Sequence, residues 1–334
     1  MRSRVFSMVF AAGLLLAAPA AVQAVDDTSH AEYQSLTYSG TQAVSAYAGG
    51  FPITLVGVVL NNSEDWLNPA ANYNETKWNM GGQAQFVIQA VPGYGVAGDT
   101  GGTAVYLAQN YGNTWRGDPS YSYTNEEWLA RLAELNLYNG TGDASGTLRA
   151  GALVRVTAQV GTYYGGKENV NENHDKAAAN HFTIEVLDAD YGLPTATLLG
   201  LSDLKNADDS FIFDITRATG CELYQSTLVD LGNVQVTGSA TWLPNSFVTV
   251  TDGQGRTFSL NLGRNDSFTG TPLVADGQWF SVTGILNQEA GSSGMDGYRL
   301  LVTNADAFLV PEPAALALLA AALLATVSAR RRRG

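Results

Sequence analysis

Short runs of β-branched and aromatic residues, bounded by Gly, Asn and Asp, fill the chain between Phe51 and Phe308. Runs of this kind, in which apolar positions alternate with polar ones, are typical of antiparallel β-strands. Ten runs are clear, and they predict a mainly β protein. They cover residues 53–60, 84–89, 104–109, 153–160, 182–187, 228–237, 247–251, 257–262, 279–286 and 298–303.

The ten runs form two sets of five that share residues at equivalent places. The shared phrases are Thr54-Leu55-Val56 with Thr227-Leu228-Val229, Phe86-Val87 with Phe247-Val248, and Val156-Thr157 with Val282-Thr283. At the end of each set, 186–190 resembles 302–306. We infer a diverged internal repeat of one five-stranded unit.

One helix is predicted between the third and fourth runs of the first set. Thr124 and Glu127 have the spacing of a capping box, and Asn139-Gly140 supplies a stop. The apolar residues on one face of this helix are Trp128, Leu132 and Leu135. In the second set, loop 265–276 stands in place of the helix.

A helix between strands three and four of a five-stranded Greek-key barrel is where an OB-fold places it. The phrases Leu153-Val154-Arg155-Val156-Thr157 and Phe280-Ser281-Val282-Thr283-Gly284 resemble OB modules of secreted bacterial proteins. We therefore predict two tandem OB-like barrels, with a β-sandwich in two halves as the alternative. The expected domains are a signal peptide (1–24), a lead segment (25–46), a first unit (47–190), a connector (191–221), a second unit (222–309) and a C-terminal tail (310–334).

Both ends of the chain carry targeting patterns. Arg2 and Arg4 precede the apolar stretch 5–21, and Val22-Gln23-Ala24 is a small-residue cleavage site, which together predict a signal peptide. The tail begins with the sorting motif Val310, Pro311, Glu312 and Pro313, in which the prolines favour an extended backbone. The apolar run 314–329 follows and precedes the basic cluster Arg330, Arg331, Arg332 and Arg333.

The tail resembles the PEP-CTERM sorting signal, which combines a Pro-Glu-Pro motif, one membrane span and a terminal basic cluster. The resemblance implies an exosortase as processing partner, and an exported protein that is first a membrane-anchored precursor and then lies at the cell surface or outside the cell. A run of 16 residues spans about 24 Å as a helix, which is short for a membrane core of about 30 Å. A permanent single-span anchor is the alternative, whereas the arginine cluster argues against a GPI-type signal.

The charge of the exported region limits its partners. Segment 25–309 keeps 12 of the 18 Lys and Arg residues and 30 of the 31 Asp and Glu residues, so its net charge is −18. Because nucleic-acid affinity comes mainly from Lys and Arg, no nucleic-acid partner is expected. Neutral glycans and divalent cations are compatible with this charge.

Few residues have the pattern of a catalytic or metal site. His174 and His181, with Glu172 and Asp175, could bind a metal, but their spacing fits no standard zinc site, and a solvated loop is the preferred interpretation. His30 is assigned to a disordered start. The single cysteine, Cys221, lacks a nearby base and is expected to be a neutral buried thiol.

No catalytic residue, metal site or cofactor is predicted, because the chain contains none of the common nucleophile, metalloprotease or phosphate-binding motifs. We interpret Asp252-Gly253-Gln254-Gly255 as a hairpin turn. The preferred hypothesis is a non-enzymatic surface or extracellular-matrix protein. One alternative is a glycan-binding protein with extracellular polysaccharide as its partner, and the other is a secreted hydrolase with a spatially assembled carboxylate pair. The candidate ligand-binding residues are the aromatics Tyr111, Trp115, Tyr121, Tyr123, Tyr163 and Tyr164.

Overall fold

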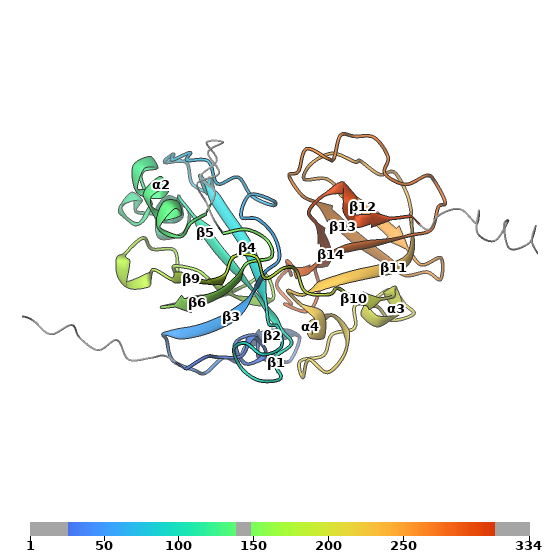
Figure 1. Ribbon diagram of the computed structural model, residues 1–334, viewed down its shortest axis with the longest axis horizontal. Helices are drawn as coiled ribbons and strands as arrows, with labels where there is room; N and C mark the ends of the chain where they lie inside the picture. Colours follow the sequence, from blue (N-terminus) through green and yellow to red (C-terminus); the bar gives the residue numbers. More distant parts are fainter. Residues whose placement is uncertain (1–25, 138–147, 311–334) are drawn as a thin grey trace, which may run out of the picture.

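The computed structural model describes residues 26–137 and 148–310, which form two β units lying side by side (Figure 1). The mainly β class is confirmed. The predicted signal peptide, the Asn139-Gly140 stop and the tail beyond Val310 lie outside the described residues. Within the described residues, no helix has the length and apolar character needed to cross a bilayer.

The second unit is a closed barrel. Its sheet has the order β10-β11-β12-β13-β15-β14-β16, and an additional pairing of β11 with β14 closes the ring of five strands β11-β12-β13-β15-β14. The strands are β10 (Thr197–Leu199), β11 (Leu228–Val236), β12 (Phe247–Thr251), β13 (Thr257–Leu262), β14 (Phe280–Gln288), β15 (Tyr298–Val302) and β16 (Phe308–Leu309). Alternate residues of these strands, such as Leu260, Val282 and Leu300, fill the barrel interior.

The first unit is a seven-stranded sheet in the order β7-β8-β5-β4-β3-β6-β9. Its strands are β3 (Ile53–Val59), β4 (Gln83–Gln89), β5 (Gly102–Ala108), β6 (Leu153–Ala158), β7 (Gly161–Tyr164), β8 (Lys167–Val170) and β9 (Thr183–Asp188). Among the described residues no backbone ladder joins its two edge strands, β7 and β9. The predicted run 153–160 forms β6, and the chain then enters a separate strand, β7, which was not predicted and pairs with β8. The prediction of a closed five-stranded barrel is therefore confirmed for one unit.

The fifth strand of the predicted repeat was wrongly matched. In the second unit β15 pairs in parallel with β13, and in the first unit the parallel partner of β5 is β8. β9, which was predicted to be the counterpart of β15, pairs with β6 and thus corresponds to β16, which pairs with β14. The error arose because Lys167-Glu168-Asn169-Val170 is short and polar, and therefore has little of the composition of a strand.

Helix α2 (Asn125–Glu134) has the predicted capping box. The Thr124 side chain accepts a hydrogen bond from the Glu127 backbone N–H, and the Glu127 carboxylate accepts one from the Thr124 N–H. Trp128, Leu132 and Leu135 are buried in the core of the first unit. The helix ends earlier than predicted, because Asn136 adopts a left-handed backbone with φ +55°.

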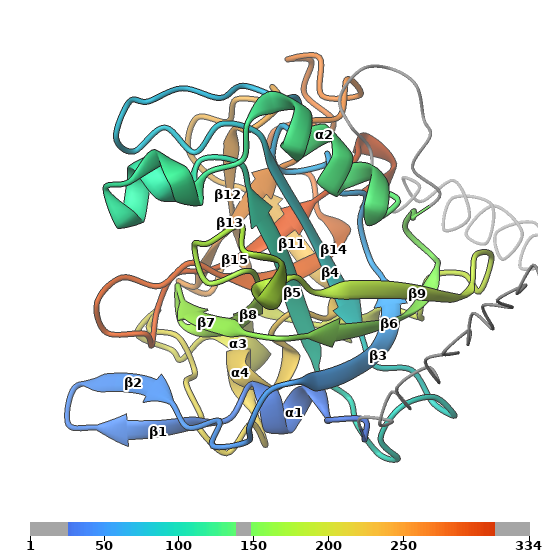
Figure 2. The same cartoon turned by 90° about the vertical axis from the view of Figure 1, so that its left-hand side faces the viewer.

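The lead segment is ordered, so the expectation of a disordered start was wrong. It contains α1 (His30–Tyr33) and the hairpin of β1 (Leu36–Ser39) and β2 (Gln42–Ser45), which lie together along one end of the first unit (Figure 2). His30 is fully buried, with its Nδ1 2.8 Å from the Thr103 hydroxyl and its Nε2 3.3 Å from the Val56 carbonyl. These contacts attach the lead segment to β3 and β5.

The remaining helices are short. The first unit has a π-helical turn η1 (Gly112–Arg116) and the 3₁₀ turns η2 (Pro119–Tyr121) and η3 (Ala178–Asn180). The connector holds α3 (Leu201–Leu204) and α4 (Gly220–Tyr224), and the 3₁₀ turn η4 (Ala305–Ala307) precedes β16. The connector strand β10 pairs in parallel with β11, so the connector packs on the second unit.

The two units contact each other through the outer faces of their sheets. A small apolar cluster joins Val87 and Ala104 of the first unit to Leu228, Ile285 and Leu301 of the second. Polar bonds surround this cluster: the Gln89 Oε1 accepts from the Leu228 N–H at 2.8 Å, and the buried Lys167 ammonium donates to the Gln288 carbonyl. The cluster therefore fixes which strand faces oppose one another.

Gly102 tests the tightness of this contact. A Cβ at Gly102 would overlap the carbonyl oxygen of Ser226 across the boundary between the units. Gly102→Ala is expected to destabilise the protein by about 1–3 kcal/mol, the usual cost of overpacking, measured as the free energy of unfolding in urea. Gly50→Ala is the matched control, because no atom lies within 4 Å of the position that its Cβ would take. Equal stability of the two variants would contradict a tight contact at Gly102.

Candidate functional site

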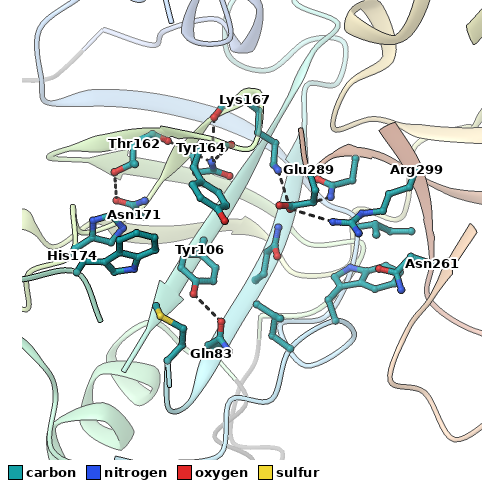
Figure 3. A pocket seen from close by; sticks show the side chains of 18 residues that line it. Gln83, Tyr106, Thr162, Tyr164, Lys167, Asn171, His174, Asn261, Glu289 and Arg299 are labelled. Carbon is teal, nitrogen blue, oxygen red and sulfur yellow. Dashed lines mark hydrogen bonds and ion pairs between the residues drawn. The ribbon is translucent and has the colours of Figure 1, made fainter. Parts of the chain in front are cut away.

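A cavity of about 350 Å³ lies between the two units, beside the apolar cluster (Figure 3). We call it the inter-unit cavity. From the first unit and its loops it is lined by Trp66, Leu67, Met80, Gln83, Gln85, Tyr106, Trp115, Thr162, Tyr164, Lys167, Asn169, Asn171 and His174. From the second unit it is lined by Asn261, Asn287, Glu289, Arg299 and Leu301.

The alternation of strand side chains explains why these residues meet. In β4, Ala84 and Phe86 point into the core of the first unit, so Gln83 and Gln85 point outward. In β14 and β15, Leu286 and Leu300 fill the barrel, so Asn287 and Arg299 point outward. The two outward faces meet, and where their residues are polar they leave the cavity open instead of packing together.

Aromatic rings form one wall and the rim of the cavity. The Trp115 and His174 rings are stacked with centroids 5.0 Å apart, and the exposed Trp78 lies edge-on to Trp115 at 5.2 Å. Trp115 is 45% exposed and Tyr164 59% exposed. Tyr106 lies deeper, and its hydroxyl donates to the Gln83 Oε1 at 2.8 Å. Flat apolar surface is therefore available to a ligand at the cavity mouth.

Three charged side chains occupy the boundary between the units. The Lys167 ammonium donates to the Glu289 Oε1 at 3.1 Å, and the Arg299 Nη2 lies 3.9 Å from the same oxygen. Burial lowers the pKa of Lys167, and the neighbouring Glu289 carboxylate opposes this shift. The Asn287 amide also donates to Glu289 Oε1, at 3.3 Å.

Three polar atoms of cavity-lining residues have no hydrogen-bond partner among the described residues. They are the donors Trp66 Nε1–H and Arg299 Nε–H and the acceptor Asn287 Oδ1. Trp66 and Asn287 are 8% and 2% exposed. Because leaving a buried polar group unpaired costs about 1–3 kcal/mol, such atoms gain when a polar ligand pairs with them.

The structure separates the six predicted aromatics. Trp115 and Tyr164 line the inter-unit cavity. Tyr111 and Tyr123 are buried in the core of the first unit. Tyr163 points to the other face of β7 and donates to the Ala43 carbonyl at 3.3 Å, while Tyr121 lies under the Arg116 guanidinium.

Most of the cavity-lining residues were missed by the sequence analysis. The signal that could have found them is a polar side chain at alternate positions of an otherwise apolar strand. Gln83 and Gln85 in β4 and Asn287 in β14 have this pattern, whereas Lys167 and Asn169 lie in the polar strand β8 and do not. It does not reveal which two faces meet.

A solvated loop was expected for the segment with His174 and His181, but part of this segment is buried. Glu172 is fully buried, accepts from Arg131 Nε at 2.9 Å and accepts a hydrogen bond from the Tyr123 hydroxyl. Burial raises the pKa of Glu172, and the Arg131 guanidinium opposes this shift. Among the described residues, no group of three His, Cys, Asp or Glu could hold a metal ion.

Two other sequence interpretations are confirmed. Cys221 is a buried thiol whose Sγ donates to the Leu204 carbonyl at 3.2 Å, and burial raises its pKa. Residues 252–255 connect the antiparallel strands β12 and β13, and Asp252 accepts from the Gln254 N–H at 2.8 Å.

A second cavity of about 510 Å³ carries a group of carboxylates. Its lining includes Glu64, Asp65 and Asp266, together with Arg264. Burial raises the pKa of Asp65 to about 6, although the Asn62 N–H donates to its carboxylate at 2.8 Å. Glu64 is ion-paired with Arg149.

These features define a two-unit β protein with a polar and aromatic cavity at the boundary of the units. The family described as the PEP-CTERM protein-sorting motif matches residues 309–333. The chain thus carries a PEP-CTERM sorting motif, and this motif implies export and an exosortase as processing partner. No curated protein matches the chain significantly.

Asp65 predicts a pH dependence of stability. Because its pKa is raised in the folded state, Asp65 stabilises the protein at low pH relative to neutral pH, and this contribution is lost as the pH rises from about 4 through about 6. The free energy of unfolding of Asp65→Asn, relative to that of the wild type, is therefore expected to rise by up to about 3 kcal/mol between pH 4 and pH 7.5, at 1.36 kcal/mol per pKa unit. Urea unfolding at both pH values measures this change. Asp266→Asn, at an exposed position on the same cavity, is the control, and equal pH dependence in both variants would contradict the assignment.

Proposed function

We propose that this PEP-CTERM protein is a non-enzymatic surface or matrix protein that binds a saccharide in the inter-unit cavity. The observation that supports this most directly is a cavity that aromatic rings border and that is lined by three residues with unpaired polar atoms, Trp66, Asn287 and Arg299. Its volume of 350 Å³ lies within the range of about 300–1,000 Å³ for small-molecule sites.

A saccharide suits the chemistry of this lining. Sugar hydroxyl groups donate and accept hydrogen bonds, and the lining offers both kinds of partner in its many Asn and Gln amides. The apolar face of a sugar ring can pack on an exposed aromatic ring, and Trp115 and Tyr164 are exposed at the mouth. A purely apolar ligand would leave the amides and the three unpaired atoms without partners.

The non-enzymatic part of the proposal rests on the charged groups of the lining. Glycoside hydrolysis commonly uses two carboxylates that flank the scissile bond. Glu289 is the one carboxylate among the described lining residues, and Lys167 is its ion-pair partner. This arrangement favours binding over hydrolysis.

A second candidate function, a secreted hydrolase, is favoured by the carboxylates of the second cavity. The raised pKa of Asp65 is a property of many general acids, and Glu64 and Asp266 line the same cavity. Glycan turnover by the wild type that disappears in Asp65→Asn, with folding intact, would replace the non-enzymatic proposal.

The first unit has the plan of an interrupted barrel. If β6 and β7 are taken as two parts of one strand, the first unit has the same order of five strands as the barrel of the second, including the parallel pairs β5–β8 and β13–β15. We infer that both units descend from one OB-like barrel, so that the ligand site lies between two related modules.

Trp115 provides the test of binding. Trp115→Ala is expected to weaken saccharide binding about fivefold or more, since one aromatic contact contributes about 1 kcal/mol. Calorimetry of the full chain in detergent against a panel of oligosaccharides measures the loss. Trp279→Ala is the matched control, because Trp279 is 44% exposed and lies outside the cavity lining. Absence of binding by the wild type, or equal loss in both variants, would contradict the proposed site.

We further propose that the signal peptide is removed after Ala24, and that an exosortase removes the tail of a membrane-anchored precursor near Val310–Pro313. Mass spectrometry of the C-terminus of the native protein is expected to find chains ending near this motif in the cell-surface fraction. Glu312→Ala is expected to retain the Arg cluster in the membrane fraction. A wild-type protein that keeps Arg330–Arg333 there would instead identify a permanent single-span anchor.

A further inference from the structure

The inter-unit cavity contains more positive than negative charge, in a region of the chain whose net charge is strongly negative. Apart from His174 and two tyrosines, its ionisable lining residues are Lys167, Arg299 and Glu289. The Glu289 carboxylate lies 3.1 Å from the Lys167 ammonium and 3.9 Å from the Arg299 guanidinium. One carboxylate thus serves two cations, and one positive charge is left without a counterion in the lining.

Arg299 is the cation with free donors. Lys167 is 1% exposed in its side chain and donates to both the Gln288 carbonyl and Glu289. Arg299, by contrast, is 25% exposed in its side chain and makes no side-chain hydrogen bond to the described residues, where its Nε is buried and unpaired. Its guanidinium lies 5.8 Å from the centre of the Phe247 ring, which holds it at the cavity wall.

Two other described arginines donate side-chain N–H groups to both a carboxylate and a carbonyl group. Arg131 donates to Glu172 and to the Phe182 carbonyl, and Arg256 donates to Asp252 and to the Lys205 carbonyl. Arg299 differs because its acidic neighbour is already bonded to Lys167. A planar guanidinium edge with free N–H groups matches the two oxygens of a carboxylate.

We propose that the inter-unit cavity selects an anionic saccharide, of the uronic acid class, and that Arg299 binds its carboxylate. This inference rests on the proposed saccharide-binding function. The amide side chains of the lining, such as Gln85 and Asn261, pair with hydroxyl groups of the same ligand. The stacked Trp115 and the exposed Tyr164 hold the sugar ring at the mouth.

The acidic character of the whole protein does not prevent such selection. Exposed charges more than a Debye length away, about 8 Å at physiological ionic strength, are largely screened. The local pair of a partly buried guanidinium and a ligand carboxylate is screened much less. The overall negative charge therefore lowers the association rate of an anionic glycan, while the contacts in the cavity determine which glycan binds with higher affinity.

The experiment compares matched ligands and matched variants. A panel of oligosaccharide pairs, each pair differing in a carboxylate or a hydroxymethyl group on one sugar, is titrated calorimetrically into the full chain in detergent. The wild type is expected to prefer the uronic acid member by about tenfold or more, the contribution of a hydrogen bond to a charged group. Arg299→Gln is expected to abolish most of this preference. Arg155→Gln is the control, because it removes the same charge from β6, outside the cavity lining.

The outcomes distinguish the anionic selection from the saccharide binding on which it rests. Binding of both members of a pair with equal affinity by the wild type would overturn the anionic selection and leave saccharide binding intact. Equal loss of the preference in Arg299→Gln and Arg155→Gln would also overturn it, by showing a general effect of charge. No binding of any member would overturn the proposed function itself. If Arg299→Gln fails to fold, the wild-type measurement is sufficient. A preference for the uronic acid member supports the anionic selection, and equal affinity overturns it.

Discussion

The contact between the outer faces of the two units determines the rest of this structure. Val87 and Ala104 pack on Leu228, Ile285 and Leu301 in one apolar cluster at the boundary of the units. The same strands continue from the cluster into the inter-unit cavity, where Gln83 and Gln85 extend the β4 face and Asn287 extends the β14 face. Because packing and cavity lie on the same faces, a displacement of one unit would change both.

Three residues that line the inter-unit cavity carry buried polar atoms without a hydrogen-bond partner among the described residues. Burying a polar group costs free energy unless it is paired, and most buried polar groups in the described residues are paired. Glu172, for example, is bonded to Arg131 and Tyr123, and Glu222 is bonded to Arg217 and Tyr298. The unpaired atoms of Trp66, Asn287 and Arg299 belong to side chains that line the inter-unit cavity.

The sorting motif and the proposed binding site lie in separate parts of the chain. The sorting motif at residues 309–333 begins at the last residue of β16, the final strand of the second unit. The inter-unit cavity lies on β13, β14 and β15 of that unit and on the facing strands of the first. The sorting motif therefore indicates the destination of the protein, and the cavity is the basis of the proposal about its activity.

The sequence by itself determined the local structure and the sorting tail. Alternation of apolar residues predicted most strands, and the Thr124–Glu127 pair predicted the start of α2, because both depend on neighbours in the chain. It did not reveal β8, whose four residues owe their strand conformation to pairing with β5 and β7. Only the tertiary structure decided that Trp115 and Tyr164 meet Asn287 and Arg299, while Tyr111 and Tyr123 are buried. The reason is that a cavity between two sheets depends on which faces meet, and residues far apart in the chain carry no local signal of that meeting.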